Sequence, residues 1–181
     1  MKTMEECERE SLLSVAEGML AAAKTAPKGS GKDKVVGVLI EKKDIEAIAQ
    51  KMEELAKEYE LAFFKRDAEN LRKSHCMIVL GAKAEPFGLT NCAMCGFKNC
   101  GLSQKAGANC AFNITDLGIA IGSAVAYAAD NRIDNRVMYS AGRACIKLGV
   151  FDENVRVAYG IPLSTSSKSI FFDRNPGAVL L

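Results

Sequence analysis

Three cysteines near the middle of the chain lie close enough in sequence to bind one inorganic group together. Cys92, Cys95 and Cys100 follow the spacing C-x2-C-x4-C, and Cys110 comes after a further gap of nine residues. A single buried thiol can replace a small apolar side chain, but three thiols in one short loop pack poorly. The spacing therefore indicates disulfides, a zinc ion or an iron–sulfur cluster.

Disulfides fit poorly with the rest of the sequence. Residues 1–10 are acidic and lack the apolar core of a signal peptide, so we expect a cytoplasmic protein whose thiols stay reduced. Seven cysteines, an odd number, cannot all pair. The most apolar run, residues 118–129, is shorter than the ~20 residues that span a bilayer, so no membrane contact is expected.

The choice between zinc and a cluster depends on the second half of the motif. Structural zinc is commonly bound by two C-x-x-C pairs, and the long gap between Cys100 and Cys110 gives no second pair. A [4Fe–4S] cluster needs four thiolates, and one loop can supply three of them. Gly96 lets the backbone turn close to the sulfur atoms and direct N–H groups at them. The spacing favours a cluster, with zinc as the alternative.

The surrounding elements alternate between helices and strands, which predicts an α/β or α+β sandwich. Apolar spacing predicts helices over residues 11–24, 44–59 (capped by Asp44), 66–73, 114–129 and 136–148. Strands are predicted over residues 35–40, 76–81 and 155–161, the last stopped by Pro162, with a final strand or packed arm at 170–172. At 181 residues we expect one domain, 1–181, with residues 88–111 as the cluster loop.

The helix over residues 114–129 is apolar on almost every face, so it must be buried on all sides. Gly118, Gly122 and Ser123 allow another backbone to approach closely. In a chain of this size a subunit interface meets that requirement, and the sequence therefore predicts a homodimer.

Other chemistry receives less support. The segment Lys28–Lys32 (KGSGK) is either a solvated connection or a turn whose glycine N–H groups and lysines bind a phosphate, and it lacks the P-loop order. His75 is the sole histidine, and no G-x-S-x-G motif is present, so a hydrolytic triad is not indicated. A net charge of +2 without a basic, aromatic stripe excludes a general nucleic-acid surface.

The motif Asn91–Cys100 resembles the [4Fe–4S] domain of Rnf-type electron transport subunits and corrinoid iron–sulfur proteins, in which glycine usually stands at the position of Ala93. Over its whole length the chain resembles the uncharacterised prokaryotic ferredoxin domain-containing protein family, in which this motif lies inside a nitroreductase-like fold. Three further segments carry the resemblance: the Ala-rich helix ending at Pro27, the helix start at residues 116–120, and residues 159–162 (YGIP).

The resemblance implies an α+β, nitroreductase-like homodimer with FMN between its subunits. Lys28, Ser30 and Lys32 then offer charge and donors to a flavin phosphate, and Cys92, Cys95, Cys100 and Cys110 hold the cluster. The resulting hypothesis is a cytoplasmic iron–sulfur protein that exchanges electrons with a flavin or an unidentified redox partner, with oxidoreductase activity left open. The alternative is a non-catalytic interaction module stapled by zinc or by a structural cluster.

Overall fold

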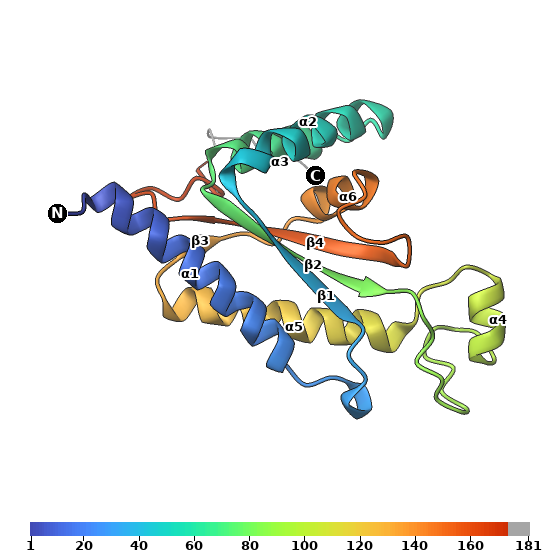
Figure 1. Cartoon of the computed structure of the whole chain (residues 1–181). Coiled ribbons are helices and arrows are strands. Elements are labelled where there is room, and N and C mark those ends of the chain that lie inside the picture. Colours follow the sequence, from blue (N-terminus) through green and yellow to red (C-terminus); the bar gives the residue numbers. More distant parts are fainter. Residues whose placement is uncertain (174–181) are drawn as a thin grey trace.

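The structure, a computed structural model, describes residues 1–173 and is built on a four-stranded antiparallel sheet (Figure 1). The strands follow the order β1-β2-β4-β3 across the sheet. Their bounds are β1 Val35–Ile40, β2 Cys76–Lys83, β3 Asp134–Asn135 and β4 Val155–Ser164. Because β2 and β4 each have a neighbour on both sides, they form the centre of the sheet.

Helices cover both faces of this sheet, so the fold has three layers (Figure 1). One face carries α1 and α5, and the other carries α2, α3 and α6. The bounds are α1 Met4–Thr25, α2 Lys42–Glu58, α3 Ala62–Lys73, α4 Cys100–Lys105, α5 Ala111–Asp130 and α6 Tyr139–Lys147. The short helix α4 lies in the connection between β2 and α5. This arrangement confirms the α+β sandwich with an inserted cysteine-rich loop.

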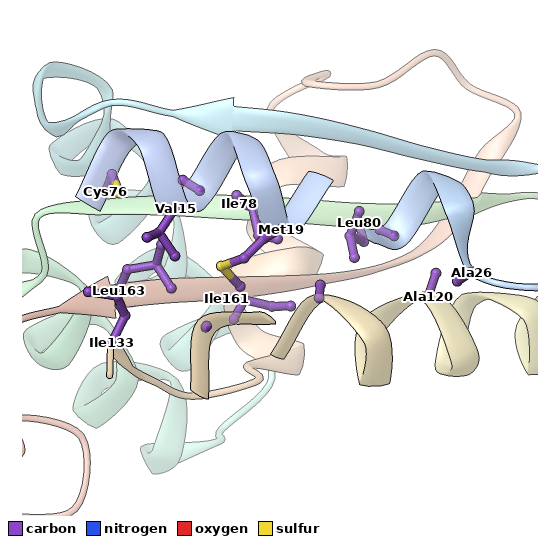
Figure 2. Packing of buried hydrophobic residues seen from close by; sticks show 14 of the residues in the cluster. Val15, Met19, Ala26, Cys76, Ile78, Leu80, Ala120, Ile133, Ile161 and Leu163 are labelled. Carbon is purple, nitrogen blue, oxygen red and sulfur yellow. The ribbon is translucent and has the colours of Figure 1, made fainter. Parts of the chain in front are cut away.

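The two layers of core follow from the alternation of side chains along the central strands. On β2, Ile78 and Leu80 face α1 and α5, whereas Met77 and Val79 face the other three helices. Figure 2 shows Met19 of α1 reaching the sheet close to Ile78. A slip of one residue would exchange the two sets of side chains, so burial on both faces fixes the register of β2.

Helix α1 begins earlier than the sequence predicts. It starts at Met4 instead of Ser11, because Thr3 and Glu6 form a capping box that satisfies the first backbone N–H groups. The N–H of Glu6 donates to the Thr3 hydroxyl, and the N–H of Thr3 donates to the Glu6 carboxylate at 2.7 Å. The acidic residues at the start of the chain therefore lie in the first turns of a helix.

Two predicted boundary signals act differently in the structure. Asp44 does not cap α2, because the capping position is Glu41. Asp44 lies instead in the first turn of the helix, where a negative charge is favourable. Pro162 does not stop β4. Gly160 and Met138 each donate a backbone N–H to the carbonyl of the other. The backbone nitrogen of Pro162 points to the same edge of β4, between this bridge and the residues that pair with β3, where no partner strand needs an N–H. The missing N–H of a proline is tolerated at such a position.

Helix α5 has one buried face and, within the single chain, one exposed face, so the expectation of burial on all sides is not met by one subunit. The exposed face carries Gly118, Ile119 and Gly122, and a Cβ added at either glycine meets no atom within 4 Å. The buried face includes two polar residues, Asn113 and Asp116, which the sequence analysis did not assign to the core.

Among the described residues, α5 alone is long and apolar enough to cross a bilayer by length and composition. It is longer than the apolar run from which the sequence analysis argued. Buried helices in the core of a domain meet the same criteria of length and composition, and α5 packs on the sheet and on α1. The hydroxyl of Ser123 donates to the Ala22 carbonyl of α1 at 2.9 Å. These contacts make α5 part of the domain core.

Gly142 offers a direct test of the packing of α6 on the sheet. A Cβ at this position would lie 2.0 Å from the Ala158 carbonyl oxygen and 2.6 Å from the Tyr159 Cα, so backbone has to move. We expect Gly142→Ala to lower the free energy of unfolding by roughly 3 kcal/mol or more, measured by urea denaturation. Gly101→Ala, whose Cβ meets nothing closer than 3.4 Å, is the control. Equal stability of the two variants would contradict this packing.

Candidate metal centre

The cysteine loop, residues 88–111, extends from one end of the sheet between β2 and α5 (Figure 1). The structure places all four candidate ligands, Cys92, Cys95, Cys100 and Cys110, around one surface hollow. Each of the four thiols is partly exposed. Residues 18 positions apart in sequence are thus brought to one site.

Hydrogen bonds at helix ends position the last two thiols of the motif. The Asn99 side chain accepts the Leu102 N–H at 2.9 Å and caps α4, so Cys100 is the first residue of that helix. Cys110 is the residue that precedes the first turn of α5. The amide of Asn113, in that first turn, donates to the carbonyls of Lys83 at 2.9 Å and Glu85 at 2.7 Å. The segments that precede and follow the cysteine loop are therefore tied together.

The backbone around the first two thiols turns tightly. Asn91 and Ala93 have φ values of 57° and 49°, and Gly96 has 82°. The Gly96 N–H donates to the Ala93 carbonyl at 2.9 Å and closes a turn over residues 93–96, which contains Cys95. Left-handed backbone favours glycine, which gives a physical reason why glycine is usual at the position of Ala93 in the motif that this loop resembles.

Cys95 has two hydrogen-bond donors beside its sulfur. The Phe97 N–H and the Ser103 hydroxyl donate to its sulfur and hold the pKa of Cys95 below its ordinary value. Ser103 is buried, with 2% of its surface exposed. Donors of this kind stabilise the thiolate, which is the form that binds metals.

The four thiols line one hollow without forming a single-ion site. Among residues 1–173, no three histidine, cysteine or carboxylate side chains are close enough to hold a single metal ion. Four thiols nevertheless line one hollow. The donor set, four thiols with N–H and O–H groups near sulfur, suits an iron–sulfur cluster.

The remaining three thiols lie elsewhere. Cys76 and Cys145 are buried in the two cores, where burial raises the pKa of Cys76 to about 11 and that of Cys145 to about 12. Cys7 is exposed on α1. His75 also lies outside the metal centre: it lines a separate hollow, and its Nδ1 is buried without a hydrogen-bond partner.

Two of the three residues predicted to bind a flavin phosphate, Lys28 and Lys32, make contacts within the chain. The ammonium of Lys28 donates to three carbonyls at the end of α1, the closest being Ala23 at 2.6 Å. Ser30 is exposed, and Lys32 lies 5.0 Å from the centroid of the Phe87 ring. Binding of a flavin phosphate by these three side chains stays a prediction.

Several residues that shape the site, Ser103 among them, were not assigned to it by the sequence analysis. Phe87 and Phe112 stack with their centroids 4.8 Å apart and line the thiol hollow. Asn113 and Asp116 act from α5 on segments far away in sequence. The signal that could have found the last two is their polarity within an otherwise apolar helix.

Comparison with solved structures defines the class of fold. The chain is similar to a nitroreductase with bound FMN from Desulfitobacterium hafniense, with a TM-score of 0.58, 17% identity, and coverage of 93% of this chain and 80% of that one. It is also similar to a nitroreductase family protein from Clostridium novyi, with a TM-score of 0.55, 20% identity, and coverage of 87% and 74%. The fold is therefore that of the nitroreductases.

Sequence comparison assigns the family. Residues 106–174 match the family described as "Uncharacterized protein containing a ferredoxin domain". A protein of Archaeoglobus fulgidus is 44% identical over 166 residues, which cover 87% of this chain and 89% of the relative. The chain belongs to this family of ferredoxin domain-containing proteins, as its motif indicated.

The environments of the seven thiols predict different rates of alkylation in the folded, metal-free protein. Cys95 should react first among the loop thiols, because its sulfur is partly exposed and its pKa is lowered. Cys76 and Cys145 should react only on unfolding, since roughly one thiol in a thousand or fewer is ionised at pH 8 when the pKa is 11 or above. Peptide mass spectrometry after timed iodoacetamide treatment measures both. Rapid modification of Cys145 under native conditions would contradict the assignment.

Proposed function

We propose that this protein holds one [4Fe–4S] cluster on Cys92, Cys95, Cys100 and Cys110 and transfers electrons one at a time. The observation that carries the proposal is the convergence of these four thiols on one hollow at the surface. A ferredoxin domain in the family description supports the same class of chemistry. Partial exposure of the thiols supports exchange of electrons with a separate partner across the surface.

The residues of the chain have distinct parts in this proposal. The four thiolates bind the cluster, which when bound supplies one-electron oxidation and reduction. The Phe97 N–H and the Ser103 hydroxyl stabilise the negative charge on the Cys95 sulfur. Phe87 and Phe112 form an aromatic wall of the hollow and limit the access of water from that side.

Flavin-dependent reduction is a second candidate, favoured by the fold, because the nitroreductase from Desulfitobacterium hafniense is described with bound FMN. In the present chain the N–H groups of Gly29, Gly31 and Lys32 donate to the Asp116 carboxylate and to carbonyls of residues 28 and 29. This loop therefore offers few free donors to a phosphate, and we derive no step through a flavin.

Metal and flavin analysis of one anaerobic sample tests the proposal. We expect close to four irons and four sulfides per chain after reconstitution, because the chain supplies one set of four thiolates. Replacing Cys92, Cys95, Cys100 or Cys110 with Ser should strip or convert the cluster, since oxygen is a poor substitute for thiolate on iron. Cys7→Ser, a matched change on the exposed surface of α1, should leave the content unchanged.

Other results of that analysis point elsewhere. One zinc per chain without sulfide would replace the cluster by a structural zinc and support an interaction module. Wild-type iron and sulfide in Cys110→Ser would remove Cys110 from the ligand set. Bound FMN, together with reduction of a nitro compound, would instead favour the flavin-dependent activity.

We further propose that the exposed face of α5 forms a homodimer interface. Ile119 is a large apolar residue on this face, with 41% of its surface exposed. Gly118 and Gly122 lie beside it, and a Cβ added at either meets no atom within 4 Å, which leaves room for a second helix to approach. Similarity to the nitroreductase fold supports a dimer in which this helix is central.

Gly122→Leu separates an interface from simple packing within one chain. Its side chain meets open space in the single chain, so we expect folding to be retained. At an interface the added side chain should weaken dimerisation by roughly 1–3 kcal/mol through overpacking. Sedimentation velocity over a micromolar dilution series measures the change. A wild-type protein that is monomeric throughout this range would refute the dimer.

A further inference from the structure

The loop at residues 28–32 is tied down at both sides. The Gly29 N–H donates to both carboxylate oxygens of Asp116, at 3.2 and 3.1 Å, and Asp116 is buried on α5. The Lys28 ammonium is held by carbonyls at the end of α1. The Gly31 and Lys32 N–H groups close a short 3-10 turn within the loop. The loop is thus a fixed part of the fold that links α1 to α5.

This fixed loop packs directly on the aromatic wall of the thiol hollow. A Cβ at Gly29 would lie 2.8 Å from Phe87 Cε2, 3.1 Å from Phe87 Cζ and 3.6 Å from Phe112 Cδ1. Lys32 adds a second contact, with its ammonium over the Phe87 ring and 3.4 Å from the Phe87 carbonyl oxygen. Phe87 and Phe112 are the two rings that line the hollow together with the four cysteines.

We propose that residues 28–32 support the aromatic wall of the metal centre, formed by Phe87 and Phe112. Through this wall, Gly29 is a positioning residue for the thiols. The role in metal binding rests on the proposed function, whereas the role in shaping the thiol hollow does not. Glycine at position 29 leaves room for the Phe87 ring, because a Cβ there would lie 2.8 Å from Phe87 Cε2 and force a shift. That ring is stacked on Phe112 and is 8% exposed, so its displacement alters the wall of the hollow.

A pair of matched variants in the same loop tests this role. Gly29→Asn places a side chain against the Phe87 ring, whereas Gly31→Asn places the same side chain where no atom lies within 4 Å. Gly31 has a φ of 67°, which asparagine tolerates better than most residues. The full chain carries each change, and circular dichroism verifies folding. If Gly29→Asn does not fold, Gly29→Ala carries the same contact with the smallest side chain.

The first measurement needs no metal. Iodoacetamide modification of Cys92, Cys95, Cys100 and Cys110 in the metal-free protein is timed by peptide mass spectrometry. We expect rates in Gly29→Asn to change by roughly tenfold relative to wild type, because overpacking disturbs the wall, and rates in Gly31→Asn to match wild type. Equal rates in the two variants would overturn the proposal.

The second measurement uses the reconstituted protein. Loss of the visible absorbance of the cluster during treatment with a chelator should be roughly tenfold faster in Gly29→Asn than in Gly31→Asn. Loss of bound FMN from Gly29→Asn, with unchanged thiol rates and cluster lifetime, would assign the loop to a flavin and overturn the proposal. Absence of iron and sulfide from the wild-type protein would refute the cluster, while the alkylation rates would still decide whether Gly29 shapes the thiol hollow.

Discussion

The hydrogen bonds from the Asn113 amide to the carbonyls of Lys83 and Glu85 are the constraint on which the site depends. They join the end of the central strand β2 to the first turn of α5, and so close the loop that carries all four candidate thiols. Closing a loop of this length costs conformational entropy, which the buried packing of β2 and α5 on either side of it offsets. With both ends fixed on packed elements, the loop can place its thiols reproducibly although it contains little regular structure.

The same fold shifts the pKa of its cysteine side chains in opposite directions in two environments. In the two cores, burial penalises the thiolate and raises the pKa of Cys76 and Cys145 far above the physiological range. In the cysteine loop, the Phe97 N–H and Ser103 hydroxyl have the opposite effect on Cys95. Environment, and not the number of cysteines, therefore separates candidate ligands from inert core thiols.

The sequence was most informative where the determining interactions are local. The strand Val35–Ile40 was predicted with its observed bounds, and the short spacing of Cys92, Cys95 and Cys100 was enough to predict one site. Interactions between distant segments could not be predicted. Gly29 meets a carboxylate 87 positions away, which changes the surroundings of a loop that looks free in sequence. From local rules, Pro162 similarly predicts the end of a strand. In the structure β4 continues, because Pro162 lies between the Gly160–Met138 bridge and the residues that pair with β3.

Helix α5 connects the two parts of the proposed function. Cys110 immediately precedes its first turn, Asp116 holds the supporting loop, and the face with Gly118 and Gly122 is exposed one turn further along. A helix moves as a rigid unit over such a distance, because its backbone hydrogen bonds link every turn to the next. In the proposed dimer, the fourth thiol and the Phe112 ring of the hollow are therefore attached to the interface helix itself. Formation of the interface would restrict the same helix end that positions Cys110, so assembly and cluster binding are expected to stabilise each other by linkage.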